Sequence, residues 1–414
     1  MKYEKYILDN GLTVLLHEDH NTSMVCVNTL FRVGSRDENA DRTGFAHLFE
    51  HLMFGGTTQI PSYDTVVEGA GGESNAFTNT DYTDYYLTLP AQELDIALTL
   101  ESDRMMNLNI DQHALQVQQQ VVTEEYHQRY VNRPYGDAWL LLRPLCFTTH
   151  PYRWPTIGSD IRHVQQASLQ DVQDFYHRFY SPANAILAIA GDIDPRHARE
   201  RVAHFYSHIP AGTCNPNHYP AEPSQTQPRQ QTVLRDVPSD ALYVCYPMPA
   251  RTSPLFAAYD LMSDILSNGD SSRLMRHVVR EKAFFTELDA YVTGDLDDSL
   301  FVISGKLAND VTPQQGLSAI EQELQTLVQA PVPDQELQKV KNKAESTFAF
   351  SHYKVMDRAM NLCYYEYMDH LEWMNTLPQI YDKVSPRDIQ YAAQNCFRPQ
   401  AQNVLYYLKN SKGS

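Results

Sequence analysis

The sequence predicts an α+β fold made of two homologous domains, each a mostly antiparallel sheet with helices packed on one face. Three observations lead to this prediction. The chain has 414 residues, which exceeds what one hydrophobic core usually organises. A proline-rich segment lies near its middle, and a short pattern near the end of each half recurs at a fixed spacing.

The proline-rich segment covers residues 209–231. Proline at such density prevents regular helices and sheet ladders, so the segment is expected to be a surface linker. We therefore predict a first domain at 1–208, a linker at 209–231 and a second domain at 232–414. The prolines of the linker are Pro210, Pro216, Pro220, Pro223 and Pro228.

The recurring pattern indicates that the second domain is a copy of the first. Each copy is typical of an N-capped helix, a turn marked by proline and a hydrophobic strand. The agreement in register and in expected structure favours a duplicated domain over a chance match. The equivalent pairs, each 217 positions apart, are Ser168 and Ser385, Asp171 and Asp388, and Pro182 and Pro399.

The order of elements within the first half favours antiparallel sheets. Several expected strands follow one another and are separated from paired helices, unlike the alternation of a doubly wound parallel sheet. Neither a GxGxxG nor a Walker sequence occurs. Strands are expected at Leu12–Leu16, Met24–Phe31, Tyr85–Leu89 and Ala185–Ala190, and helices at Phe45–Met53, Ala91–Met106, Ala114–Tyr130 and Leu169–Phe179.

The composition argues against several classes of partner. With 51 acidic and 33 basic residues, the chain has a formal net charge of −18, which opposes nucleic-acid binding. No stretch approaches the roughly 20 apolar residues of a membrane span, and the first residues lack the apolar region of a signal peptide. Six cysteines without a CxxC pair are typical of reduced thiols. We expect a cytoplasmic protein with no nucleic-acid or membrane partner.

The strongest chemical signal is the run Gly44-Phe-Ala-His47-Leu-Phe-Glu50-His51. Histidines four residues apart share one face of a helix, and Glu50 lies about 60° from His47 and about 100° from His51 around it. Two neutral imidazoles suit Zn²⁺, which keeps a position open for water in catalytic sites, and a nearby carboxylate can take a proton from that water. This H-x-x-E-H order predicts a zinc-dependent peptidase with His47 and His51 as metal ligands and Glu50 as catalytic base.

A chance grouping on a polar helix face is the alternative explanation of this run. The neighbouring residues favour the metal site, because they make the segment apolar almost all round and therefore buried. A buried His-Glu-His group needs polar partners or a metal. These neighbours are Leu48, Phe49, Leu52, Met53 and Phe54.

A third ligand is expected from the helix at 111–130. Its apolar positions Ala114, Leu115, Val117, Val122 and Tyr126 form one arc of the helix. By the helical period, Glu125 falls inside this arc and Glu124 falls about 100° away, at its edge. A carboxylate within an apolar face must be neutralised or ligated, which makes Glu125 the better ligand. The alternative is that both glutamates only form salt bridges.

Two motifs together resemble the pitrilysin/insulinase (M16) family of inverted zinc peptidases. They are His-Leu-Phe-Glu-His followed by Phe54-Gly55, and a valine-rich helix that ends Val121-Val122-Thr-Glu-Glu. Among family members the chain is most similar to bacterial two-domain proteins related to the β subunit of the mitochondrial processing peptidase. The resemblance implies a catalytic first half, a second half that supports substrate, and a third zinc ligand at the position of Glu125.

The segment at 71–86 is similar to the strand that lies beside the metal in this family. The resemblance implies that Asn75 and Ala76 belong to an edge strand that receives the substrate backbone. An open edge offers unpaired N–H and C=O groups, so that a peptide can add as one more strand. Considered alone, this Gly- and Asn-rich segment is more typical of a hairpin turn, and its distance from the zinc motif and the family resemblance favour the strand.

The second half carries Ser271-Ser272-Arg273-Leu274 and Arg280-Glu281-Lys282, similar to the second half of the family, but no H-x-x-E-H. The resemblance implies that Arg280 binds substrate. Seven residues after this arginine the family usually has a tyrosine, and here the position is Glu287. That difference puts substrate binding by the chain alone in doubt, unless another tyrosine such as Tyr291 replaces it.

A second departure lies near the metal. Seven residues before Glu125 the family usually has another glutamate, and here the position is Gln118. A charge outside the ligands is therefore missing, and such outer groups tune metal affinity and rate.

Three functions are compatible with these features. The leading prediction is a zinc-dependent endopeptidase that hydrolyses peptides or unfolded protein segments. The alternatives are a non-catalytic or weakly active subunit of an M16-like hetero-oligomer, and a zinc hydrolase with another substrate. Two homologous halves per chain also favour a homodimer or a heterodimer with a homologous subunit.

Overall fold

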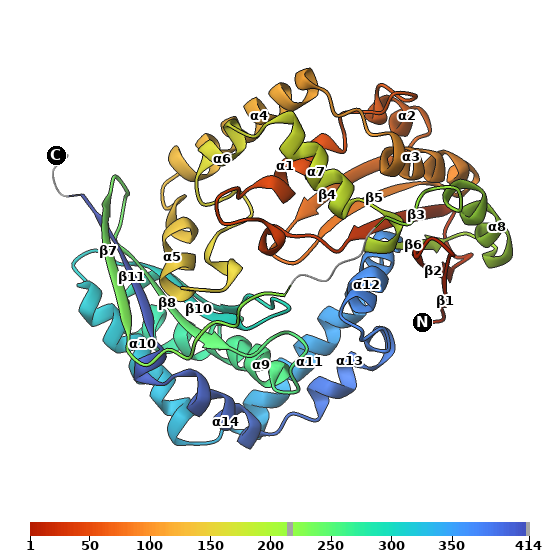
Figure 1. Ribbon diagram of the computed structural model, residues 1–414. Coiled ribbons are helices and arrows are strands. Elements are labelled where there is room, and N and C mark those ends of the chain that lie inside the picture. The colour runs from red at the N-terminus through yellow and green to blue at the C-terminus, as the bar shows by residue number, and fades with distance from the viewer. Residues whose placement is uncertain (213–217, 411–414) are drawn as a thin grey trace. The chain divides into compact units, whose positions relative to one another are not determined.

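The structure is a computed structural model that describes residues 1–212 and 218–410. The chain folds into two compact units, each built around its own sheet (Figure 1). Unit 1 comprises Met1–His127, Trp154–Tyr219 and Ala349–Asn375, and unit 2 comprises Gln128–Arg153, Pro220–Phe348 and Thr376–Ser414. Each unit therefore contains a segment from the opposite half of the sequence, and the boundaries at 208 and 232 stay a prediction about the duplicated sequence.

The sheet of unit 1 has the strand order β1-β2-β6-β3-β5-β4. Strands β2 and β6 are parallel, and every other neighbouring pair is antiparallel. Strand β4 lies at an edge and pairs with β5 alone. The bounds are β1 (Glu4–Ile7), β2 (Thr13–Glu18), β3 (Met24–Phe31), β4 (Glu73–Thr78), β5 (Thr83–Pro90) and β6 (Ala185–Gly191).

The sheet of unit 2 repeats this topology without an equivalent of β1. Its order is β7-β11-β8-β10-β9, with β7 and β11 parallel and the other pairs antiparallel. Strand β9 takes the place that β4 has in unit 1. The bounds are β7 (Arg229–Arg235), β8 (Ala241–Met248), β9 (Phe285–Val292), β10 (Ser299–Leu307) and β11 (Asn403–Lys409).

The predicted repeat is visible in the helices that end each half. Helix α7 (Leu169–Phe179) and helix α14 (Pro386–Cys396) are offset by 217 residues at both ends. Each begins with a capping box, formed by Ser168 and Asp171 in α7 and by Ser385 and Asp388 in α14. The predicted α+β fold of two homologous halves is thus confirmed.

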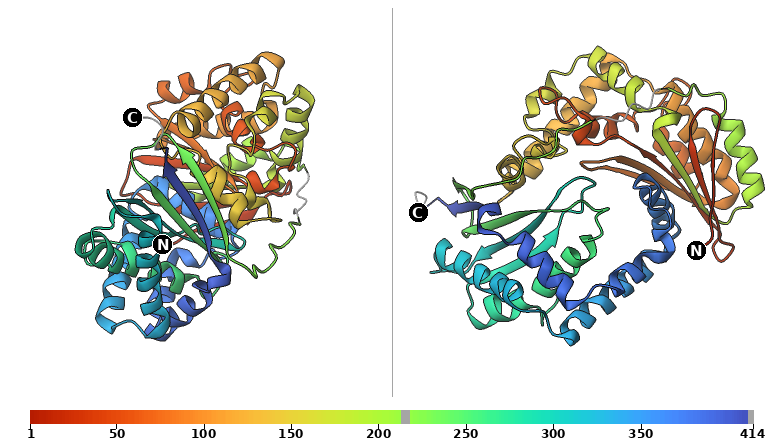
Figure 2. Two further views of the ribbon diagram at one scale, coloured as in Figure 1. Left: turned by 90° about the vertical axis from the view of Figure 1, so that its left-hand side faces the viewer. Right: turned by 60° about the horizontal axis from the view of Figure 1, so that its bottom comes forward.

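The helices of each half pack on one face of their sheet, as predicted, and a helix from the other half covers the second face. In unit 1, Thr29 of β3 donates to Glu101 of α3 (Leu94–Asn107) on one side. On the other side, Sγ of Cys363 in α12 (Val355–Tyr367) lies 3.7 Å from the carbonyl oxygen of Asn28. The right-hand view of Figure 2 shows α12 along this sheet. In unit 2, helix α5 (Ala138–Cys146) covers β7, β8 and β11 in the same way. We call α5 and α12 the exchanged helices.

The remaining helices connect the strands and cover the two sheets. In chain order they are α1 (Phe45–Leu52), α2 (Tyr63–Gly69), α3 (Leu94–Asn107), α4 (Gln112–Tyr126), α5 (Ala138–Cys146), α6 (Ile161–Gln165), α8 (Pro195–Tyr206), α9 (Phe256–Ser267), α10 (Pro313–Gln329), α11 (Asp334–Phe350), α12 (Val355–Tyr367) and α13 (Trp373–Asp382). None of the described helices is long and apolar enough to cross a membrane.

Most of the expected elements occur with shifted ends. The helix expected to reach Tyr130 is α-helical only to Tyr126 and continues as a π-helical turn, His127–Val131. Strand β7 begins at Arg229, inside the predicted linker. Five cysteines are buried free thiols, and the sixth, Cys214, lies outside the described residues.

Candidate metal centre

The short helix α1 is fixed at its start by a buried carboxylate. Gly44, which precedes the helix, has φ +89°, and a Cβ there would lie 2.7 Å from the carbonyl oxygen of Ile157. The carboxylate of Glu38 accepts hydrogen bonds from the N–H groups of Gly44 and Ala46, both at 2.8 Å. These N–H groups have no partner within the helix. Burial raises the pKa of Glu38, and the two hydrogen bonds oppose this shift.

One face of α1 is anchored in the core of unit 1. Leu48, Phe49 and Leu52 are buried, and the ring of Phe49 stacks on Tyr180 at a centroid distance of 5.0 Å. The imidazoles of His47 and His51 leave the helix on another face, with ring centroids 4.9 Å apart. The core packing therefore determines where both imidazoles point.

Helix α4 brings Glu125 to these histidines. Its Oε1 lies 3.6 Å from His47 Nε2, and its Oε2 lies 3.2 Å from His51 Nε2. Within the described part of the chain, this is the group of three His, Cys, Asp or Glu residues whose ligand atoms converge, all within 4.8 Å of one another. Two imidazole nitrogens and one carboxylate are the donor set of many catalytic zinc sites. The residues present thus fit a Zn²⁺ ion with a position left open.

The two glutamates near the end of α4 point in different directions, and Glu125 as third ligand stays a prediction. Glu125 points to the histidines, whereas Glu124 is exposed to solvent. However, Val117, which the predicted arc included, is 39% exposed, so the buried face of α4 is narrower than predicted. Leu115 and Val122 alone are fully buried on this helix.

Glu50 lies beside the three donors but is not one of them. Burial raises the pKa of its carboxyl group, and the charge of Glu125 acts in the same direction. The neighbouring groups of Thr78 and His51 oppose this rise. Thr78, the last residue of β4, therefore lies beside Glu50.

The segment with Asn75 and Ala76 is a strand and not the hairpin turn that was the alternative. Both residues lie in β4, opposite Tyr86 and Tyr85 of β5. The outer edge of β4 has no neighbour among the described strands, and α1 packs against β4. The open edge and the candidate metal centre are thus adjacent within unit 1 (Figure 1).

The second-half residues lie in unit 2. The guanidinium of Arg280 pairs with Asp270 at 2.8 Å, and Glu287 of β9 pairs with Lys306 at 2.8 Å. The described partner of Glu287 is thus Lys306 rather than Arg280. Tyr291 packs against the apolar cluster beneath α5.

Helix α9 has the place in unit 2 that α1 has in unit 1, because each follows the central strand β8 or β3. Its sequence, Phe256-Ala-Ala-Tyr-Asp-Leu-Met-Ser-Asp-Ile-Leu-Ser, contains no histidine. The metal donors are therefore confined to the first half among the described residues.

Several supporting residues were not found from the sequence. Arg104 is 2% exposed, pairs with Glu101 at 2.6 Å and lies 4.5 Å from the ring centroid of Tyr85. The hydroxyl of Tyr85 donates to the carbonyl oxygen of Phe49 at 3.3 Å, which connects this ion pair to α1. The spacing of the apolar residues in α3 did not indicate this buried ion pair between Arg104 and Glu101. Glu38 and Thr78 were missed because their contacts depend on the folded chain.

Comparisons with known proteins agree with the fold and with a family of zinc proteases. Residues 13–134 match the family model described as Insulinase (Peptidase family M16), and residues 166–344 match the model described as Peptidase M16 inactive domain. The zinc protease PqqE of Helicobacter pylori is 27% identical over 414 residues, with 99% of this chain and 93% of that protein covered.

Solved structures extend the similarity to three dimensions. The crystal structure of a protease from Helicobacter pylori has a TM-score of 0.94 and 27% identity, and covers 98% of this chain and 99% of that one. The periplasmic protease PqqL from Escherichia coli has a TM-score of 0.82 at 19% identity, and the match covers 99% of this chain but 48% of that one. The latter similarity concerns the fold alone.

The duplicated sheet-and-helix fold and the paired family models define the class of protein. The chain belongs to the pitrilysin/insulinase (M16) family of peptidases.

Proposed function

We propose that this protein is a zinc-dependent endopeptidase that hydrolyses peptides or unfolded protein segments. The observation that carries the proposal is the convergence of His47, His51 and Glu125 beside Glu50 and the open edge of β4. The relative PqqE is named a zinc protease, which supports both the metal and the activity.

In the proposed mechanism each residue has one task. His47, His51 and Glu125 hold Zn²⁺, which when bound supplies Lewis-acid chemistry to water and to the scissile carbonyl. Glu50 accepts a proton from the attacking water and returns it to the leaving amine. Helix α1 packs against β4, so that Glu50 lies beside the strand that is proposed to receive the substrate.

Substrate binding is proposed for both halves. The backbone of Asn75 and Ala76 receives the peptide as an added strand, since an open edge presents unpaired N–H and C=O groups. Arg280 of the second half is the proposed second contact with substrate. Its pairing with exposed Asp270 is weak enough to be exchanged for a peptide carbonyl, because exposed ion pairs contribute at most about 1 kcal/mol.

Removal and return of the metal test this function. The purified protein is incubated with a generic unstructured peptide such as casein, before and after chelation and again after one equivalent of Zn²⁺. Hydrolysis that disappears on chelation and returns with zinc supports the proposal. Hydrolysis that survives complete zinc removal, or no hydrolysis by the zinc-loaded protein, contradicts it.

A non-catalytic or weakly active subunit of a hetero-oligomer is the second candidate, favoured by Glu287 in place of the family's tyrosine. The match covers 48% of PqqL, which leaves room in that longer chain for a second body of this size. We therefore propose pairing with a second homologous subunit, in a homodimer or a heterodimer. Peptide turnover, measured with and without the homologous partner, distinguishes the two candidates. The protein concentrations should span the range in which light scattering detects dimerisation. A cytoplasmic location stays a prediction.

A further inference from the structure

The segment that follows β3 contacts the turn between β4 and β5 and holds it in place. The N–H groups of Ser35 and Arg36 donate to the carbonyl oxygens of Asn79 and Thr80 at 3.1 and 3.0 Å. The side chain of Asn79 also accepts the N–H of Asp81 at 2.7 Å, which stabilises the turn internally. The position of this turn is therefore determined by backbone contacts with residues 35 and 36.

A buried ion pair strengthens the same contact. Nη1 of Arg36 lies 2.8 Å from Oδ1 of Asp81, and the two side chains are 11% and 5% exposed. The chain comes so close here that a Cβ at Gly34 would lie 2.5 Å from the nitrogen of Asp81. A buried ion pair is stable only when its geometry is good and further hydrogen bonds satisfy its remaining polar atoms.

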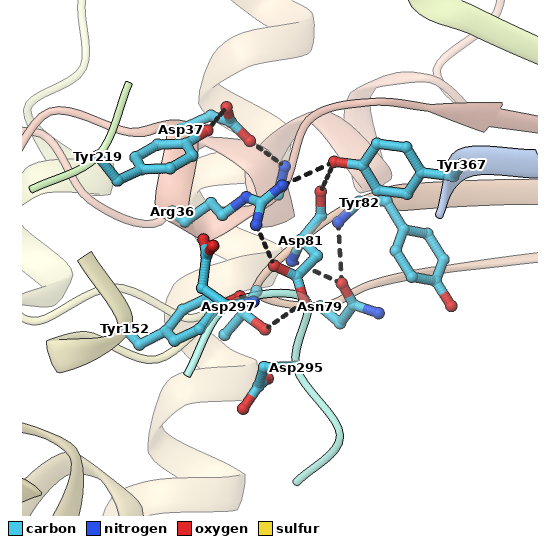
Figure 3. Close-up of polar contacts among 12 residues, drawn as sticks. Arg36, Asp37, Asn79, Asp81, Tyr82, Tyr152, Tyr219, Asp295, Asp297 and Tyr367 are labelled. Carbon is cyan, nitrogen blue, oxygen red and sulfur yellow. Dashed lines mark hydrogen bonds and ion pairs between the residues drawn. The ribbon is translucent and has the colours of Figure 1, made fainter. Parts of the chain in front are cut away.

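Tyr367 of the exchanged helix α12 supplies such hydrogen bonds (Figure 3). Nη2 of Arg36 donates to the hydroxyl oxygen of Tyr367 at 2.9 Å, and this hydroxyl donates to the carbonyl oxygen of Asp81 at 3.0 Å. The phenol thus bridges the cation and the turn. Tyr82 packs beside it, 6.0 Å from Tyr367 and 5.5 Å from Tyr364 between ring centroids.

The turn is close to the proposed base. Thr78 is the last residue of β4 and lies three positions before Asp81, and helix α1, which carries Glu50, packs against β4. A displacement of the turn therefore moves Thr78 and the end of the strand that is proposed to receive the substrate.

We infer that Tyr367 is a positioning residue for the peptidase reaction, contributed by the second half of the chain to the site in the first half. It acts through Arg36 and Asp81 on the β4–β5 turn, and through β4 on Glu50. The inference rests on the proposed function, because β4 and Glu50 have their tasks only in that reaction. The second half then has a role at the site in addition to the substrate contact proposed for Arg280.

The effect of the hydroxyl is separable from the docking of α12. The helix is also held by Arg358, which pairs with Asp19, by Glu366, which pairs with Lys5 at 2.6 Å, and by fully buried Cys363. Loss of one hydroxyl should therefore leave α12 on the sheet. What changes is the restraint on the turn.

The test compares Tyr367→Phe with Tyr353→Phe. Both variants lose one hydroxyl from the segment contributed by the second half, but Tyr353 is 79% exposed. For each we would measure kcat, KM, bound zinc, Tm and amide hydrogen exchange over β4 in the substrate-free protein. Arg36→Lys is added as a conservative variant that keeps the positive charge and loses the planar guanidinium with its several N–H donors.

For Tyr367→Phe we expect a loss in kcat/KM of about tenfold, with KM raised as well as kcat lowered, because a misplaced edge strand weakens both binding and alignment. Exchange in Glu73–Thr78 should become faster, while bound zinc stays at wild-type stoichiometry. Tyr353→Phe should match wild type. Asp81→Asn combined with Tyr367→Phe should cost less than the sum of the single effects, since both act through one contact.

Two results would overturn the inference. One is wild-type KM and wild-type exchange over β4 in Tyr367→Phe. The other is a kcat that falls in proportion to Tm and bound zinc while KM stays unchanged. Such a result would mean that the hydroxyl of Tyr367 has only a general structural role. Because exchange over β4 is measured without substrate, it still reports on the turn if the wild-type protein proves not to be a peptidase. A failure of the proposed function is therefore distinguishable from a failure of this inference.

Discussion

Oε2 of Glu125 lies 3.2 Å from Nε2 of His51, although the two residues come from different helices of unit 1. Without a cation between them, this contact is a hydrogen bond or an ion pair, and with one the two atoms are adjacent ligands. His47 completes the set from the same helix as His51. The identity of the third ligand is therefore the first point to test.

Glu125→Gln should lose zinc, and Glu124→Gln should retain about one equivalent. The amide is a much weaker zinc ligand than the carboxylate, whereas Glu124 points to solvent. Metal analysis after dialysis against a weak chelator measures the difference. Equal zinc content in the two variants would remove Glu125 from the ligand set.

Arg104→Met should destabilise the protein strongly. The substitution leaves Glu101 buried without its cation and removes the cation from beside the rings of Tyr63 and Tyr85. Breaking a buried ion pair by removing one partner costs about 3–5 kcal/mol. Urea denaturation measures this loss, with Arg199→Met as the control, because Arg199 is half exposed and its pairing with Glu4 at 3.8 Å is long. A loss below about 1 kcal/mol, as for an exposed pair, would contradict the expectation.

Glu38→Ala should destabilise α1 and weaken zinc binding together. The substitution leaves the N–H groups of Gly44 and Ala46 without their acceptor, at a cost of about 1–3 kcal/mol. Because α1 carries two ligands, its loosening should also raise the dissociation constant for zinc. Glu38→Gln keeps an acceptor and should recover part of both losses. If Glu38→Ala bound zinc as tightly as wild type, the Glu38 cap would have no effect on metal binding, and this prediction would be wrong.

The docking of α12 should contribute a pH-dependent part of the stability. The hydrogen bond from Arg358 lowers the pKa of Asp19 from its ordinary 3.8 to about 2. A lowered pKa in the folded state means that this contribution is complete above pH 3.8 and is lost as the pH falls toward 2. Asp19→Asn should therefore flatten the dependence of Tm on pH between about 4 and 2. An unchanged profile in this variant would exclude Asp19 from the acid response.

The sequence predicted the features that depend on local pattern. Helical spacing placed His47 and His51 on one face, and the recurrence of Ser168 and Asp171 at Ser385 and Asp388 predicted matching capped helices. The same reasoning favoured Glu125 over Glu124 as the third ligand, although it wrongly placed Val117 on a buried face.

The exchange of α5 and α12 could not be predicted in this way. Their sequences are amphipathic like those of the other helices, and nothing in the period of a helix states which sheet it will cover. The Tyr367 bridge has the same origin, because its partners Arg36 and Asp81 are hundreds of positions away. Glu38 and Arg104 were likewise hidden, since a buried charge is identified by its partners and not by its own spacing.

The most direct test of the central claim is a parallel measurement of bound zinc and peptide turnover in Glu50→Gln. The amide keeps the shape of the side chain but cannot accept the proton of the attacking water. The account predicts zinc at wild-type stoichiometry and a turnover lowered by about two to four orders of magnitude. Turnover close to wild type, or a loss of zinc equal to the loss of activity, would contradict the assignment of Glu50 as the base beside a centre formed by His47, His51 and Glu125.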